Sequence, residues 1–424
     1  MKTYKNYLFI IFSFLSSYLA IEAQKLSHIS IVQCYVWAEE NYPLIKQLSI
    51  MDKIAEYDID NASKGYLPQM SINGQASYQS QVTELKLDLP NAGIPAINKD
   101  QYKIYGEIFQ PLTNFSAIKS KQHQILLSTE LQKQEVKVDL FKLRDRVNQL
   151  YFGILLSSTK IEQLKVLQTD IDSTIVKVEA ASSHGIATSN DVKLLKVERL
   201  SLNQKIQESI STKTAYINVL ATLINQNIST HTQFAIPKAP SLKLEINRPE
   251  LKIFELQNES IILRKKDIYN KRIPDVGLFF QGGYGRPAFN FLSNQFDAFY
   301  ITGVKINWNL SSIYTSSNER QIMNLNVDKI NLKRENFILN TNLVKSQQVE
   351  EINKINILIS TDIQIIDLRK SIKNTAEMQL TNGLITTLDY INYLNNEAIA
   401  QQNLILHETL LLLAQHNLKM TMGN

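Results

Sequence analysis

The sequence LFKLRDRVNQLYFGILLSSTKIEQLKVLQTDIDSTIVKV occupies Leu140–Val178 and contains no proline and one glycine, Gly153. Its apolar residues are spaced alternately three and four apart, which is the heptad period of a coiled-coil helix. The twelve seam positions are Leu140, Leu143, Val147, Leu150, Ile154, Ser157, Ile161, Leu164, Gln168, Ile171, Ile175 and Val178, of which only Ser157 and Gln168 are polar. The stretch without breakers extends from about Ala117 to Ser182. At ~1.5 Å per residue we expect one helix roughly 100 Å long.

Breakers of regular structure are scarce in the rest of the chain as well. The 424 residues include only 13 Gly and 10 Pro, which excludes turn-rich sandwiches, propellers and doubly wound folds. A net charge of +5 over 424 residues is weak and gives no reason to expect a nucleic-acid partner, which would require a clustered basic face. The single cysteine, Cys34, permits neither an intrachain disulfide nor a thiolate metal cluster.

The N-terminus has the features of a secretory signal peptide. Lys2 and Lys5 precede the apolar run Leu8–Ala20, and a cleavage position follows at Ala23. The apolar run is shorter than the about 20 residues that a membrane-spanning helix needs. We therefore expect residues 1–23 to be a signal peptide and the mature protein to be exported.

The two halves of the chain resemble each other. Pro68 recurs 206 residues later as Pro274, and Gly185 recurs 198 residues later as Gly383. The change of offset indicates an eight-residue insertion in the first half, ahead of its long helix. The predicted repeats are residues 24–235, with strands at about 69–79 and 101–110 and a tip at 183–191, and residues 236–424, with strands at about 275–285 and 297–307 and a tip at 381–392.

Each repeat is predicted to contain a helix, two strands, a very long helix, a tight turn and a returning helix. The second long helix has a looser seam, consisting of Val349, Ile352, Ile359, Ile363 and Ile366 with Asn356 in register. Each strand alternates apolar and polar residues and carries aromatic residues near its ends, which suits a transmembrane barrel. An ordinary hairpin on a soluble core would alternate in the same way.

Four strands cannot close a barrel by themselves, and open edges are not tolerated in lipid. Two chains would give eight strands around a filled interior, whereas three would give twelve strands around a lumen. We therefore expect a mainly α fold with a small transmembrane β part. In this fold, long coiled-coil hairpins accompany four strands that form one third of a trimeric twelve-stranded barrel.

No residue pattern predicts catalysis, a cofactor or a metal ion. The six histidines are scattered, and the glycine-rich Gly282–Gly285 lacks the Lys-Ser or Lys-Thr of a phosphate loop. The sequence therefore predicts a protein that is not an enzyme. The basic residues of Arg264–Lys266 and Lys271–Arg272 form either a solvated helix face or an interfacial contact with lipid.

The order of these features resembles the TolC-type outer-membrane factors over essentially the whole mature chain. The shared features are the secretion signal, the duplicated halves, Arg248–Leu251 at the start of the second half, proline before the strands, and glycine-containing turns followed by Asp191 and Asp389. The resemblance implies a homotrimer in the outer membrane with most of its mass in the periplasm. It also implies a duct for efflux or type I secretion, whose tip meets a periplasmic adaptor (membrane fusion) protein and an inner-membrane pump of the RND or ABC type. The alternative is a soluble periplasmic coiled-coil adaptor or scaffold protein.

The same resemblance implies a gate at the periplasmic tip. The residues that it places there are Gly185, Thr188, Asp191, Gly383, Thr387, Asp389 and Asn392. Family members often carry an arginine two residues after the second glycine and a second aspartate three after the one that matches Asp389. This chain has Ile385 and Asn392 at those positions. Asp389 would then form a single ring of carboxylates in a trimer, or it would only cap the returning helix.

Overall fold

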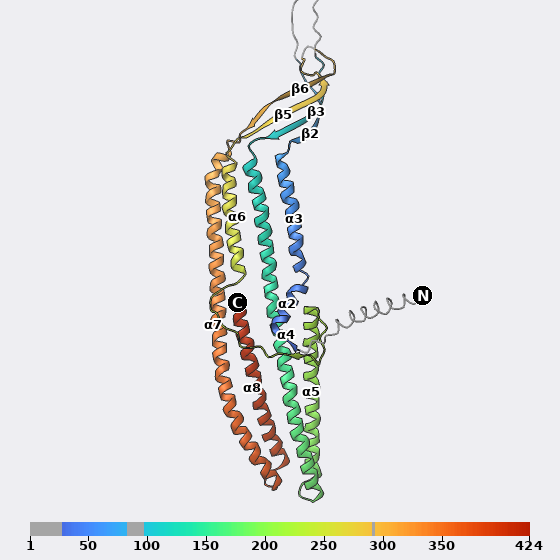
Figure 1. Ribbon diagram of the computed structural model, residues 1–424, viewed down its shortest axis with the longest axis vertical. Helices are drawn as coiled ribbons and strands as arrows, with labels where there is room; N and C mark the ends of the chain where they lie inside the picture. Colours follow the sequence, from blue (N-terminus) through green and yellow to red (C-terminus); the bar gives the residue numbers. More distant parts are fainter. Residues whose placement is uncertain (1–27, 83–96, 291–292) are drawn as a thin grey trace, which may run out of the picture. The chain divides into compact units, whose positions relative to one another are not determined.

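The computed structural model describes residues 28–82, 97–290 and 293–424, so the predicted signal peptide lies outside the described residues (Figure 1). The helices are α2 (Ile31–Asn41), α3 (Ile45–Ser63), the short 3-10 helix η1 (Lys64–Tyr66), α4 (Phe115–Ser183), α5 (Ser189–Ile224), α6 (Glu250–Asn270), α7 (Ser312–Thr381) and α8 (Thr387–Met422). The strands are β1 (His28–Ile29), β2 (Gln69–Tyr78), β3 (Asp100–Pro111), β4 (Gln233–Phe234), β5 (Asp275–Arg286) and β6 (Asp297–Asn307). No described helix combines the length and the hydropathy that crossing a bilayer requires.

The chain forms two compact units. Unit 1 contains the described residues up to Ile45 together with Lys137–Pro249 and Phe337–Asn424, and unit 2 contains those within Lys46–Val136 and Glu250–Asn336. The mainly α fold with four long strands is confirmed. The division of the sequence into a signal peptide and two repeats stays a prediction.

Unit 2 carries an antiparallel sheet in the order β2-β3-β5-β6. The register places Ile72 opposite Gly106, and Gly106 opposite Gly282 on the next strand. Gly283 allows β5 to lie close to β3, because a Cβ at this position would come within 2.2 Å of the Ile104 carbonyl oxygen. The edge strands β2 and β6 have no further strand partner among the described residues.

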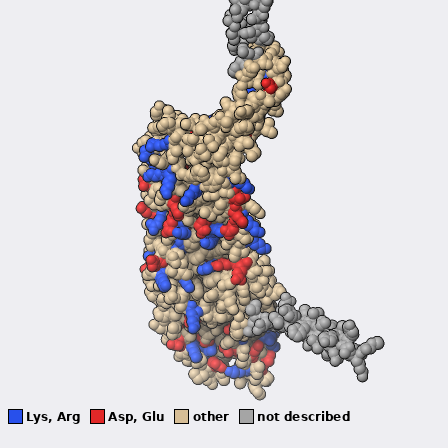
Figure 2. Space-filling model, turned by 45° about the horizontal axis from the view of Figure 1, so that its top comes forward, with Lys and Arg blue, Asp and Glu red and all other residues tan. Residues whose placement is uncertain are grey.

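One face of this sheet is apolar and exposed along all four strands. Its exposed residues are Met70, Ile72, Tyr78, Tyr102, Ile104, Ile108, Leu278, Phe280, Tyr284, Tyr300, Val304 and Ile306. In the view of Figure 2 the charged side chains gather over the helices, while the end that bears the strands is almost free of them. Exposed apolar surface of this extent indicates contact with a partner or a membrane.

Unit 1 contains the coiled-coil part of α4. Eleven of the twelve predicted seam residues are buried. The remaining one, Gln168, is half-buried, and its amide donates a hydrogen bond of 2.7 Å to the Asn203 side chain on α5. The heptad prediction for this helix is confirmed because its apolar residues pack against α5 and α8 in two core clusters.

The seam predicted for α7 is partly wrong. Ile352 is buried, but Ile363 is 49% exposed and Asn356 is exposed as well. The buried and half-buried positions are Ile352, Ile355, Ile359, Asp362 and Ile366, which alternate three and four apart. This register could not be identified from hydrophobicity alone, because one of its seam positions is a carboxylate, Asp362. Asp362 is paired with His407 of α8.

Candidate functional site

The predicted tips are two tight turns of unit 1 that join α4 to α5 and α7 to α8. Gly185 ends α4 with φ of 74°, and Gly383 ends α7 with φ of 69°. Both lie in the left-handed region that L side chains rarely adopt, so alanine at either position would cost about 1 kcal/mol.

Backbone hydrogen bonds close the two turns in the same way. After α4, the Gly185 N–H donates to the Ser182 carbonyl at 3.1 Å and the Ile186 N–H donates to Ala181 at 2.9 Å. After α7, the equivalent bonds run from Gly383 to Leu380 at 3.0 Å and from Leu384 to Gln379 at 2.9 Å. This pair of bonds is the Schellman motif, which satisfies the last carbonyls of each helix.

Each returning helix begins with a capping box. Asp191 accepts hydrogen bonds from the Thr188 N–H at 2.8 Å and from its hydroxyl at 2.6 Å, while the Asp191 N–H donates to the Thr188 hydroxyl oxygen at 3.3 Å. Asp389 makes the equivalent bonds with Thr386 at 3.1, 2.6 and 3.1 Å. The reciprocal bonds satisfy backbone donors that the helices leave unpaired.

Asp389 therefore does cap α8, through Thr386 rather than Thr387. The hydrogen bonds from Thr386 hold the pKa of Asp389 below its ordinary value, and those from Thr188 lower the pKa of Asp191. Both carboxylates consequently remain charged at neutral pH.

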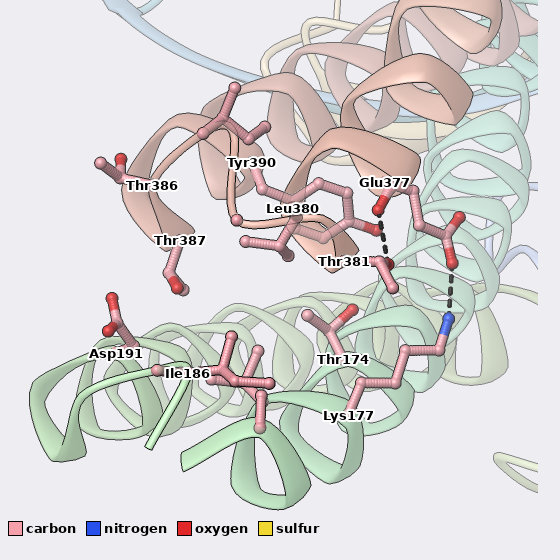
Figure 3. A pocket seen from close by; sticks show the side chains of 15 residues that line it. Thr174, Lys177, Ile186, Asp191, Glu377, Leu380, Thr381, Thr386, Thr387 and Tyr390 are labelled. Carbon is pink, nitrogen blue, oxygen red and sulfur yellow. Dashed lines mark hydrogen bonds and ion pairs between the residues drawn. The ribbon is translucent and has the colours of Figure 1, made fainter. Parts of the chain in front are cut away.

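Thr387 and Asn392 differ in their surroundings. Thr387 is 4% exposed and faces Asp191 from the other turn, where its hydroxyl also lowers the pKa of that carboxyl (Figure 3). Asn392 is exposed on α8, and its side chain makes no hydrogen bond with any other described residue. The structure thus brings the two turns together through Asp191 and Thr387, and Asn392 lies outside this contact.

A cavity of about 290 Å³ lies between the two turns, lined by residues of α4, α5, α7 and α8. On its α4 side, the Lys177 ammonium pairs with the Glu377 carboxylate of α7 at 2.5 Å (Figure 3). The Tyr390 hydroxyl of α8 bonds to Thr174 of α4, and burial raises the pKa of Tyr390. Polar contacts therefore link the first hairpin to the second at this end of unit 1.

A second ion pair lies farther from the turns. Lys373 of α7 is 3.1 Å from Glu397 of α8 and 3.8 Å from Asp170 of α4, and the side chains of Lys373 and Glu397 are only 18% and 7% exposed. Burial opposes the charge on Lys373, but its hydrogen bond and charge interaction with Glu397 raise its pKa. Three helices are thus joined through one half-buried ammonium group.

Sequence reasoning missed these interhelical contacts. The spacing of turn residues identifies Gly185 and Gly383, whereas Lys373 and Glu397 pair across helices that are distant in sequence. One signal was available, since Lys373 falls on the heptad register of Ile352, Ile359 and Ile366, where an apolar residue is expected.

No protein-family model and no curated protein matches the sequence. Solved structures do match. The CusC channel aligns with a TM-score of 0.68 at 12% identity, covering 93% of this chain and 92% of that one. The chain has the TolC-type fold.

Two further structures share the TolC-type fold. The CmeC outer-membrane channel of Campylobacter jejuni aligns with a TM-score of 0.62 at 11% identity, covering 93% of this chain and 86% of that one. The open state of the MtrE outer-membrane channel of Neisseria gonorrhoeae aligns with a TM-score of 0.58 at 13% identity, covering 93% of this chain and 89% of that one. Since the alignments cover nearly the whole chain, the TolC-type fold includes both the helices and the strands described above.

Proposed function

We propose that this protein is an outer-membrane channel that serves as the duct of a tripartite efflux system or a type I secretion system. The observation that carries the proposal is the four-stranded sheet of unit 2, which exposes an apolar face and leaves both edges open. The outer-membrane channels of similar fold support the proposal.

The sheet edges argue for assembly. Unpaired backbone N–H and C=O groups cost several kcal/mol each in a bilayer, so β2 and β6 need partners if the strands are to cross one. The β6 strand of one copy can pair antiparallel with β2 of the next, which continues the order of the sheet. Three copies would give twelve strands and a lumen, as conduction requires. We infer a homotrimer with its strands in the outer membrane and its helices in the periplasm.

The turns of unit 1 are suited to a protein partner. Ile186, Leu384 and Leu388 are large apolar side chains exposed at or next to the turns. We propose that they meet a periplasmic adaptor protein, which would connect the duct to an inner-membrane pump of the RND or ABC type. In a trimer the charged Asp389 carboxylates would form one ring around the opening, biasing it toward cations.

Conductance measurements test this proposal. We expect detergent-extracted oligomers from the outer-membrane fraction to conduct ions in planar bilayers. A monomer found only in the soluble periplasmic fraction would contradict the proposal and favour the adaptor or scaffold protein instead.

The same measurement tests Asp389 as a gate. We expect Asp389→Ala to raise the resting conductance more than Thr386→Ala, because the second variant weakens the same cap but keeps the carboxylate. Equal conductance in the two variants would leave Asp389 with the capping role alone.

A further inference from the structure

A groove with basic walls lies in unit 2, between the start of α4 and the end of α6. It has a volume of about 490 Å³, and its lining includes Lys119 of α4 and Lys266 of α6. Both lysines are exposed, and neither has an ion-pair partner among the residues that the structure describes. Two ammonium groups from different helices therefore face one groove without neutralisation.

Hydrogen bonds between the two helices fix the shape of the groove. The Ser116 hydroxyl donates to the Asn270 side chain at 3.1 Å, and Ser120 and Gln124 both donate to the Asp267 carboxylate. Asp267 of α6 is thus hydrogen-bonded to α4, and Glu259 of α6 lies 4.0 Å from His123, which also lines the groove.

The wall of the groove near the strands is apolar. Tyr269 and Ile273, which lie between Lys266 and β5 along the chain, are exposed, whereas Leu263, on the other side of Lys266, is buried. The groove therefore offers cationic groups and an apolar surface side by side, the combination that a phospholipid headgroup with its acyl chain requires.

The position of the groove relative to the strands is also specific. β3 ends at Pro111, and Lys119 lies four residues after α4 begins at Phe115. Lys266 lies four residues before α6 ends at Asn270, and β5 begins at Asp275. Both lysines are thus about 6 Å along their helices from the strand-bearing end.

The local charge favours an anionic ligand. Residues 115–129 and 262–274 together contain seven lysine or arginine residues and one aspartate. Because basic residues beside a membrane attract anionic lipid, this excess is complementary to a phosphate headgroup.

We propose that this groove binds the phosphate of an anionic phospholipid, with Lys119 and Lys266 as its ligands and Tyr269 and Ile273 against the start of an acyl chain. The proposal rests on the proposed function, because it requires the strands to lie in a membrane. It assigns the groove to the inner leaflet of the outer membrane.

The test is lipid binding to the purified full chain in non-ionic detergent, followed by native mass spectrometry. We expect short-chain phosphatidylglycerol to bind the protein, and Lys119→Gln combined with Lys266→Gln to weaken binding about tenfold. The control, Lys121→Gln with Arg264→Gln, removes the same charge from the same two helices outside the groove. It should weaken binding less than the first double variant does, because Lys121 and Arg264 are not among the residues that line the groove. Circular dichroism of both double variants checks that they fold.

Three results would contradict the proposed binding of anionic phospholipid in this groove. These are equal losses in the two double variants, equal binding of phosphatidylcholine, and full competition by inorganic phosphate at the concentration of the lipid. Membrane fractionation and conductance of the same samples separate this proposal from the previous one. If the channel conducts but shows no preference for anionic lipid, only the proposed lipid binding is contradicted. If the protein never enters the membrane, the proposed channel function is contradicted.

Discussion

We expect Ile72→Lys to prevent assembly in the outer membrane, and Asn73→Lys, one residue along the same strand, to be tolerated. Ile72 lies in β2 on the apolar face of the sheet and is 82% exposed. Asn73 belongs to the opposite face, which would face the lumen of the proposed barrel. A lysine facing lipid near the midplane of the bilayer costs about 2–4 kcal/mol, and a trimer incurs this cost three times.

The comparison of these two variants needs only membrane fractionation and the yield of detergent-extracted oligomer. Both variants add one positive charge at neighbouring positions of β2, Ile72 being exposed and Asn73 half-buried, so general effects of charge on export cancel. Equal yields of oligomer from Ile72→Lys and Asn73→Lys would show that the apolar face does not contact lipid.

Lys373→Met is expected to destabilise the packing of α7 and α8 at the end of unit 1 that carries the two turns. The substitution leaves the Glu397 carboxylate buried, with only the Gln401 amide as a hydrogen-bond donor at 2.7 Å. Loss of one partner from a buried ion pair costs about 3 kcal/mol. We expect hydrogen exchange to accelerate in α7 and α8 near Lys373.

The matched control is Lys354→Met on the same helix, whose partner Glu351 is exposed. An exposed pair of this kind contributes about 0–1 kcal/mol, so exchange should change little. Adding Glu397→Leu to Lys373→Met should restore most of the protection, because the unpaired carboxylate is then removed. Equal exchange in Lys373→Met and Lys354→Met would show that the buried pair does not hold these helices together.

The sequence predicted those parts of the fold that depend on local periodicity. The α4 seam was readable because nearly all of its positions are apolar, and the strands because apolar and polar residues alternate along each one. The α7 seam was misassigned because Asp362 and Lys373 occupy heptad positions, and their burial depends on His407 and Glu397 of another helix. Sequence spacing shows that Lys373 is on the seam, but it does not identify the partner on the other helix.

In the candidate site, too, some features could be predicted from the sequence and others could not. Gly185, Gly383, Asp191 and Asp389 belong to local turn and capping motifs, which a sequence displays directly. The burial of Thr387 against Asp191 depends on the approach of two turns that are about 200 residues apart along the chain. Only the structure could place them together.

The pairing of β3 with β5 indicates how two copies would join. Glu107 lies opposite Gln281, whose amide donates to the Glu107 carboxylate at 2.9 Å. With the repeat offsets of 198 and 206 residues, the equivalent positions are Lys305 in β6 and Gln75 in β2. If neighbouring copies pair as the two halves do, Lys305 of one copy lies opposite Gln75 of the next.

Crosslinking at this position tests the central claim most directly. The native Cys34 is buried, and burial raises the pKa of its thiol to about 12, so it should not react. The account predicts that the chain with Gln75→Cys and Lys305→Cys, oxidised in outer membranes, forms disulfide-linked species up to the trimer. Ser71→Cys with Lys305→Cys, displaced by four residues in register, should stay monomeric. Monomers alone from the matched pair, or a ladder extending beyond the trimer, would contradict a closed barrel of three chains.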